Sequence, residues 1–187
     1  MQNQSPASNP HPVITLISGG QTGADRAALD FALAANLPHG GWCPKGRLAE
    51  DGPIPPRYML RETPSANYLQ RTEWNVRDTD ATVVFAILSR LTGGTKRTVQ
   101  FALKHAKPCL VLHLDIAPTE AASALTTWFA EHRIRRLNVA GSRASKAPAI
   151  GEFTTRVLTL AFAKLNDDSA TTPTISPTSP SPPAQLG

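Results

Sequence analysis

Residues 13–35 read VITLISGGQTGADRAALDFALAA, and this pattern is typical of one strand followed by one helix. The β-branched run at 13–17 predicts a buried strand that ends at a glycine turn. Residues 24–35 carry apolar side chains at helical spacing, which predicts a helix. A strand, a glycine turn and a helix in this order are the repeating unit of a parallel α/β sheet.

The same alternation of strand and helix continues along most of the chain. We expect further strands at 81–88, 109–113 and 137–140, and helices at 98–105, 119–132 and 153–165. Strands as apolar as these are typical of a parallel sheet that helices cover on both faces. The sequence therefore predicts an α/β fold, with a Rossmann-like, doubly wound and mostly parallel sheet in a single domain. Only the segment 39–80, rich in Gly, Pro and Arg, departs from this pattern, with at most a short strand at 41–43.

The two ends of the chain differ in composition from its middle. Residues 1–12 contain three prolines and no charged residue, and residues 166–187 contain five Pro, four Ser and four Thr. Such segments cannot bury enough apolar surface to offset the entropy of ordering them. We therefore expect disordered tails at 1–12 and 166–187, and one ligand-binding domain at 13–165.

Several classes of protein are not expected. No apolar run reaches the roughly 20 residues that a membrane-spanning helix needs. The N-terminal residues do not pair a basic segment with an apolar one, so they do not resemble a secretory signal. The two cysteines, Cys43 and Cys109, lack the spacing of a disulfide framework or a zinc site. We expect a cytoplasmic protein with no membrane partner and no metal-binding residues.

The charge of the chain favours an anionic partner. The formal net charge is +5, and it is about +7 without the two tail residues Asp167 and Asp168. Charge alone leaves open whether the anion is a nucleotide, a phosphorylated cofactor, an oxyanion or nucleic acid, or whether the charge only keeps the protein in solution. Because no expected helix gathers Lys or Arg on one face with aromatic residues between them, we do not expect nucleic-acid binding.

Two glycine-bearing segments follow expected strands, SGGQTGADR at 18–26 and TGGTKRT at 92–98. Ligands of open parallel sheets bind at the carboxyl ends of the strands, and the N–H groups at a helix start favour an anion. Neither segment has the GK[ST] ending of a P-loop or the GxGxxG spacing of a dinucleotide site. The alternative is that 18–26 is a tight turn with Asp25 as a favourable first-turn charge, and that Thr95 only caps a helix.

The segment 39–80 adds polar candidates. If residues 68–78 are helical, Arg71, Asn75 and Asp78 share one face, where Arg suits an oxyanion and Asn an amide or hydroxyl. An exposed helix with ion pairs is the alternative. The five histidines are scattered, and no Ser-His-Asp set or HExxH pair occurs. The sequence thus favours binding chemistry over catalysis.

Five blocks of this sequence together resemble the putative molybdenum carrier family. They are SGGQTGADRAALDFA (18–32), PHGGWCPKGRLAEDGPIP (38–55), LRETPSANYLQRTEWNVRDTDATVVF (60–85), LTGGTKRTVQFALKHAKPCLV (91–111) and LNVAGSRASK (137–146). That family is similar to molybdenum cofactor carrier proteins and, more distantly, to lysine-decarboxylase-like proteins with phosphoribohydrolase activity. The resemblance extends from Ile14 to Leu165.

The resemblance implies a homo-oligomer, dimeric or tetrameric, that binds the molybdenum cofactor (molybdopterin) and protects it until delivery to molybdoenzyme apoproteins. The ligand carries a phosphate and a molybdenum oxyanion. Transferred by motif, the cofactor-binding residues would be Gly19, Gly20, Gln21, Thr22, Gly23, Lys45, Gly46, Arg71, Asn75, Gly93, Gly94, Thr95 and Thr98.

The chain departs from the phosphoribohydrolase relatives at one important place. Those proteins share a PGGxGTxxE loop whose Glu belongs to the active site, whereas the comparable segment here, LTGGTKRTVQ, has no carboxylate. Glu62 or Glu73 could replace it. We therefore expect a non-catalytic carrier of the molybdenum cofactor or a related phosphorylated or oxyanion ligand. The alternative is a nucleotide-processing enzyme or a nucleotide sensor.

Overall fold

The computed structural model describes residues 13–170, with side chains as far as Asp167. The tail expected at 1–12, and residues 171–187 of the other one, lie outside the described residues. Helix α5 (Ile150–Ala170) continues past Leu165, so its backbone enters the segment that the composition assigns to the second tail.

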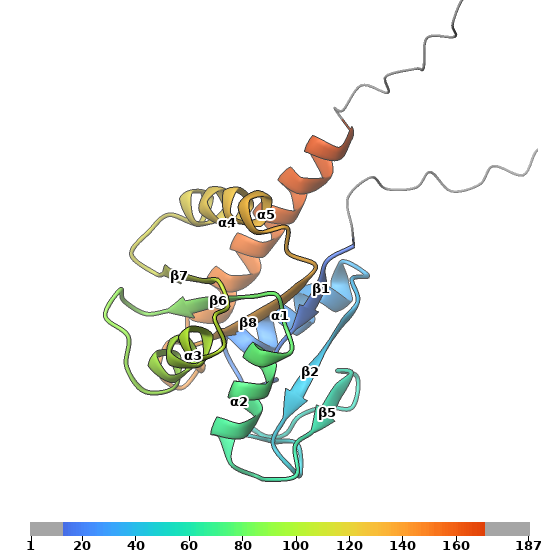
Figure 1. Ribbon diagram of the computed structural model, residues 1–187, viewed down its shortest axis with the longest axis vertical. Coiled ribbons are helices and arrows are strands. Elements are labelled where there is room, and N and C mark those ends of the chain that lie inside the picture. Colours follow the sequence, from blue (N-terminus) through green and yellow to red (C-terminus); the bar gives the residue numbers. More distant parts are fainter. Residues whose placement is uncertain (1–12, 171–187) are drawn as a thin grey trace, which may run out of the picture.

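Six parallel strands form the sheet at the centre of the domain (Figure 1). They are β1 (Thr15–Ile17), β2 (His39–Cys43), β5 (Leu60–Glu62), β6 (Ala81–Ala86), β7 (Cys109–His113) and β8 (Arg136–Gly141). Their order in the sheet is β5-β2-β1-β8-β6-β7. The chain therefore builds outward from β1 to one edge, crosses to β6 and β7, and returns with β8 between β1 and β6. The predicted Rossmann-like α/β fold is confirmed, and the strand order reverses around β8.

The helices form two groups, one on each face of the sheet. On one face, α1 (Ala24–Ala34) and α4 (Pro118–His132) both pack against α5, and on the other α2 (Tyr68–Arg77) packs against α3 (Gly93–Lys104). Parallel strands need such crossovers, and their right-handed sense assigns each helix to its face. Among the helices of residues 13–170, none combines the length and the apolar character that crossing a membrane requires.

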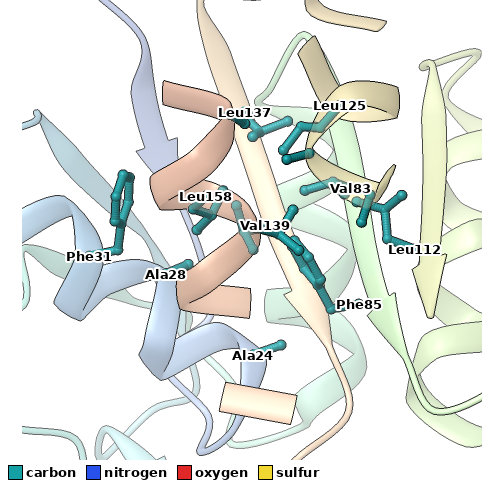
Figure 2. Packing of buried hydrophobic residues seen from close by; sticks show 14 of the residues in the cluster. Ala24, Ala28, Phe31, Val83, Phe85, Leu112, Leu125, Leu137, Val139 and Leu158 are labelled. Carbon is teal, nitrogen blue, oxygen red and sulfur yellow. The ribbon is translucent and has the colours of Figure 1, made fainter. Parts of the chain in front are cut away.

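The main hydrophobic core lies between the sheet and the group α1, α4 and α5 (Figure 2). Alternate residues of the neighbouring strands β6 and β8 point into it, among them Val83 and Phe85 of β6 and Val139 of β8, all fully buried. Phe85 meets Phe153 of α5 edge to face, with ring centroids 6.0 Å apart. Burial of one apolar side chain of this size contributes about 1.5–3 kcal/mol to the free energy of folding. A core of many such side chains holds the ends of the strands in fixed positions.

The structure corrects several boundaries. Helix α3 begins at Gly93 and not at Thr98, so the second glycine segment is itself the first turn of a helix. The segment 39–80 contains the strand β5 and a hairpin, β3 (Leu48–Ala49) and β4 (Gly52–Pro53), that the sequence does not predict. These strands have two or three residues each, too few to show a periodic pattern.

Candidate functional site

A small cavity lies where the strand order reverses, at the carboxyl ends of β1, β8 and β6. Its volume is about 120 Å³. It is lined by the loop after β1, by α2, by the start of α3 and by the loop after β8; the residues are Gln21, Asp25, Arg71, Thr72, Ile87, Thr92, Gly94, Thr95, Thr98, Ala140, Gly141, Ser142, Arg143 and Lys146. This is the position at which open α/β sheets bind ligands.

The start of α3 forms one wall of the cavity. Thr92 is the N-cap residue, and its side chain makes no capping hydrogen bond. The hydroxyls of Thr95 and Thr98 donate back to the carbonyls of Thr92 (2.7 Å) and Gly94 (3.1 Å). A side chain at Gly94 would meet nothing within 4 Å, so the backbone there is open to a ligand. The first-turn N–H groups have no acceptor within the helix and lie at its positive end, which suits an anion.

A buried ion pair between Arg71 of α2 and Asp25 of α1 forms a second wall. The Arg71 Nη1 lies 2.9 Å from the Asp25 Oδ2, and the two side chains are 12% and 4% exposed. Burial raises the pKa of the Asp25 carboxyl, while Arg71 and backbone N–H groups act against that rise. The Arg71 Nε is buried and has no hydrogen-bond partner among the described residues.

Gln21 supplies a second buried donor without a partner. Gln21 is 5% exposed, and its Oε1 accepts hydrogen bonds from the backbone N–H groups of Thr22 (2.9 Å) and Glu50 (3.0 Å). Its Nε2 is buried and has no partner within residues 13–167. Buried polar atoms almost always have a partner, so two unpaired donors on residues that line one cavity favour an acceptor at this place.

The charges around the cavity are mainly positive. Arg71, Arg143 and Lys146 line it, and the single carboxylate among its described lining residues, Asp25, is engaged by Arg71. Within the part of the chain that the structure describes, no three His, Cys, Asp or Glu side chains come together as metal ligands. The donor set thus suits the oxygen atoms of an anion, through N–H groups and cations.

Five of the candidates from the sequence line this cavity: Gln21, Arg71, Gly94, Thr95 and Thr98. Two others support it. Gly19 lies directly under the Arg71 guanidinium, where a Cβ would be 1.7 Å from Nη1. Gly93 begins α3 with a left-handed backbone, at φ 54°.

The remaining glycines and the threonine of the first loop face the protein's own chain. A Cβ at Gly20 would lie 2.6 Å from Leu60, and one at Gly23 would lie 2.4 Å from the Ser142 carbonyl oxygen. The Thr22 hydroxyl donates to the Glu50 carboxylate and accepts the Ala144 N–H (3.2 Å). These residues shape the loop and do not line the cavity.

Asn75 lies outside the cavity, although it shares a helix face with Arg71. It is 2% exposed, its Oδ1 accepts the Trp42 N–H (2.7 Å), and its Nδ2 donates to the Trp42 carbonyl (2.9 Å). Asp78 accepts a hydrogen bond from the Trp42 indole (2.8 Å). The shared face of α2 therefore packs on β2, where the Asn75 amide continues the hydrogen bonding of the strand beyond the end of β1.

Lys45 and Gly46 are exposed in the loop after β2 and do not line the cavity. The Gly46 N–H donates to the Glu62 carboxylate at 2.5 Å. Glu73 pairs with Lys104 (2.6 Å) and His105 (3.0 Å). Neither Glu62 nor Glu73, the two possible replacements for the missing carboxylate, therefore lines the cavity.

Sequence reasoning missed five lining residues with polar side chains, Thr72, Thr92, Ser142, Arg143 and Lys146, and it interpreted Asp25 only as a first-turn charge. A usable signal was present for the loop after β8. The block GSRASK directly follows a predicted strand, so the rule for the carboxyl ends of strands applies to it as well.

A larger cleft of about 600 Å³ lies over β1 and β2, and Trp42, Arg61 and Arg136 are among its lining residues. None of its described lining side chains has a buried polar atom without a partner. The smaller cavity is therefore the better candidate site, because two of its lining residues, and none of the described residues of the larger cleft, carry a buried donor without a partner.

Comparison with known proteins agrees with the fold. A crystal structure described as "Putative molybdenum carrier protein", from Syntrophus aciditrophicus, is 48% identical, covers 80% of this chain and 96% of its own, and superposes with a TM-score of 0.78. The chain matches none of the curated proteins with which it was compared. The model of the circularly permutated YpsA SLOG family matches residues 16–162. The chain belongs to this family.

Proposed function

We propose that this protein is a non-catalytic carrier that binds the molybdenum cofactor, or a related phosphorylated or oxyanion ligand, in the cavity at the start of α3. The observation that carries the proposal is the pair of buried donors, Gln21 Nε2 and Arg71 Nε, that have no acceptor among the described residues. The similar chain at 48% identity is named as a molybdenum carrier, which supports the same ligand class.

The size of the cavity limits which part of a ligand it holds. A water molecule takes roughly 30 Å³ in the liquid, so about 120 Å³ suits one phosphate or one tetrahedral oxyanion and not a whole pterin. When bound, the cofactor would supply its phosphate or its molybdenum oxyanion as the anionic group. Gln21, Arg71 and the first turn of α3 would hold that group, and the rest of the ligand would lie outside, beside the half-exposed Leu88 and its neighbour Ile87.

Assembly and delivery form a second part of the proposal. We expect a cytoplasmic homo-oligomer, dimeric or tetrameric, that passes its ligand to molybdoenzyme apoproteins, because the resemblance to carrier proteins implies both. Light scattering on the purified chain tests the oligomer. A monomer at all concentrations would contradict this part while leaving the ligand site open to its own test.

A titration of the full chain with molybdate, inorganic phosphate and cofactor released from a molybdoenzyme tests the binding proposal. We expect saturable binding of at least one of them, weakened about 10- to 100-fold by Gln21→Met, because a hydrogen bond to a charged group is lost. Gln100→Met is the matched control, since Gln100 is exposed on α3 and lies outside the cavity. Absence of saturable binding of all three ligands would refute the proposal.

One observation favours the alternative of a nucleotide-processing enzyme. Asp25 is a carboxylate that lines the cavity, and burial raises its pKa as an acid catalyst would require. Release of free base from a nucleoside monophosphate, abolished by Asp25→Asn in a folded protein, would establish this function. If none of a panel of nucleotides is hydrolysed, the alternative of a nucleotide-processing enzyme is refuted.

A further inference from the structure

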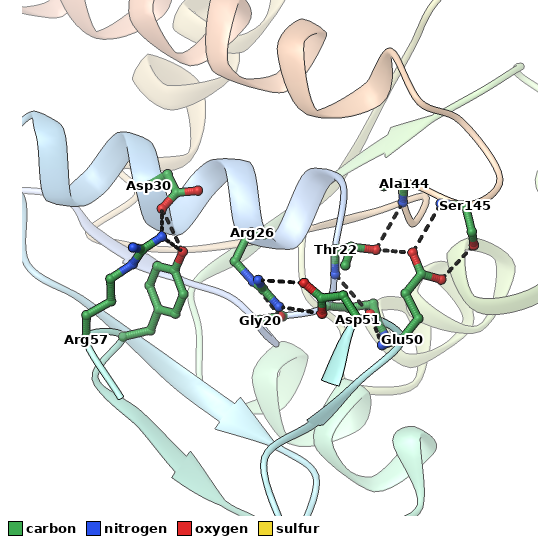
Figure 3. Close-up of polar contacts among 11 residues, drawn as sticks. Gly20, Thr22, Arg26, Asp30, Glu50, Asp51, Arg57, Ala144 and Ser145 are labelled. Atoms are coloured by element: carbon green, nitrogen blue, oxygen red, sulfur yellow. Dashed lines mark hydrogen bonds and ion pairs between the residues drawn. The ribbon is translucent and has the colours of Figure 1, made fainter. Parts of the chain in front are cut away.

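The β3–β4 hairpin lies across the first glycine loop, and its tip binds that loop through two acidic residues (Figure 3). Asp51 forms an ion pair with Arg26 at 3.2 Å, and the Arg26 Nε also donates to the Gly20 carbonyl at 3.1 Å. Glu50, the preceding residue, points to the other side, toward the loop after β8. The hairpin is thus attached at its tip to both loops that border the cavity.

The Glu50 carboxylate joins three segments of the chain. It accepts hydrogen bonds from the Thr22 hydroxyl, from the Ser145 N–H (3.1 Å) and from the Ser145 hydroxyl (2.6 Å), and the Arg143 Nε lies 3.8 Å away. Burial works to raise the pKa of Glu50, but the hydrogen bonds from Ser145 and Thr22 outweigh it and hold the pKa below its ordinary value. The Glu50 carboxylate is therefore ionised at neutral pH.

This attachment fixes the orientation of the Gln21 amide. The Gln21 Oε1 accepts the N–H groups of Thr22 and Glu50, and Glu50 is held in place by its own carboxylate. If the amide were turned over, its NH₂ group would face two backbone donors and lose both hydrogen bonds. The Nε2 is consequently held as a donor on the side away from these N–H groups, in a residue that lines the cavity.

We propose that Glu50 is a positioning residue that holds the Gln21 amide in one orientation, with its Oε1 on two backbone N–H groups and its Nε2 kept as a donor for an oxyanion in the cavity. This inference rests on the proposed function. It adds the residue that sets the direction of one of the donors.

A double-mutant cycle tests whether Glu50 acts through Gln21. Molybdate binding is measured by calorimetry for the wild type, Gln21→Met, Glu50→Gln and the double variant. We expect a loss of about 10- to 100-fold for Gln21→Met, about tenfold for Glu50→Gln, and no more for the double variant than for Gln21→Met alone. The control is Asp51→Asn, which alters the same hairpin tip without touching Gln21 and should change the affinity less than about twofold.

The outcomes separate this proposal from the one on which it rests. A wild type that binds neither molybdate nor inorganic phosphate would refute the oxyanion site itself. A wild type that binds molybdate, together with losses that add in the double variant or an unchanged affinity in Glu50→Gln, would overturn only the role of Glu50. If Glu50→Gln does not fold, Ser145→Ala takes its place in the cycle, because it removes a donor to the same carboxylate.

Discussion

Gly19→Ala should destabilise the protein by breaking the buried ion pair between Arg71 and Asp25. The new Cβ would lie 1.7 Å from the Arg71 Nη1 and 2.6 Å from its Cζ, so the guanidinium must leave its place. Loss of one partner from a buried pair costs about 3–5 kcal/mol. A displaced Arg71 can turn into the adjoining cavity, and alanine lowers the entropy of the unfolded chain, so we expect about 2–3 kcal/mol. Gly19 is not among the glycines with positive φ, so the backbone adds no strain.

Urea unfolding followed by tryptophan fluorescence measures this free energy in two backgrounds. In Arg71→Ala, the guanidinium that obstructs the Cβ is absent and only the Asp25 Oδ2, 2.9 Å from the Cβ, must shift, so Gly19→Ala should cost less than about 1 kcal/mol. A cost that persists in full in the Arg71→Ala background would refute the reasoning. It would mean that Gly19 is required for another reason than the room it leaves for Arg71.

Three further predictions concern the side chains of Asn75, of the two cysteines and of Glu50. Asn75→Ala should lower the free energy of unfolding by about 2–4 kcal/mol in thermal denaturation, because two backbone groups of Trp42 lose their partner, yet molybdate affinity should stay at the wild-type value. Native protein should alkylate slowly with iodoacetamide at pH 8 and quickly after denaturation, since burial raises the pKa of Cys109 to about 11 and also raises that of Cys43. Because the pKa of Glu50 is lowered from 4.5 on folding, its carboxylate stabilises the protein above that pH and loses this effect as the pH falls through the folded-state pKa. Melting temperatures recorded from about pH 3 to about pH 7 should therefore fall less steeply at the acid end for Glu50→Gln than for the wild type.

The sequence was sufficient for the strands β1, β6, β7 and β8 of the sheet, because they are mostly apolar runs. The prediction at 109–113 matches β7, and those at 13–17 and 137–140 overlap β1 and β8 with small shifts at their ends. The short strands β3, β4 and β5 could not be predicted, since their place depends on contacts with distant residues. Arg47 shows this, because its guanidinium donates to four backbone carbonyls, those of Ile54, Pro55, Tyr58 and Leu60.

The position of the candidate cavity was predictable, but not all of its lining residues were. Arg71 and Asn75 lie one helical turn apart, and periodicity places them on one face without deciding what that face meets. The structure shows that one turn makes the difference: Arg71 reaches past the end of β1 to Asp25 and the cavity, whereas Asn75 stops at the backbone of Trp42. Such a distinction depends on the lengths of neighbouring strands, which the sequence does not reveal.

In a phosphate-binding glycine loop, the glycines usually both shape the loop and let the backbone contact the ligand. In the loop SGGQTGAD these two roles are separate. Its glycines give their space to the protein itself, Gly19 to the Arg71 guanidinium and Gly23 to the loop after β8. In the proposed function, recognition therefore falls to the Gln21 amide and the Arg71 guanidinium, together with the first turn of α3. Because Thr22 and Glu50 hold Gln21, and Asp25 holds Arg71, these two side chains are ordered during folding and not during binding. An anion bound as proposed would gain affinity from this order without a change in the shape of the protein.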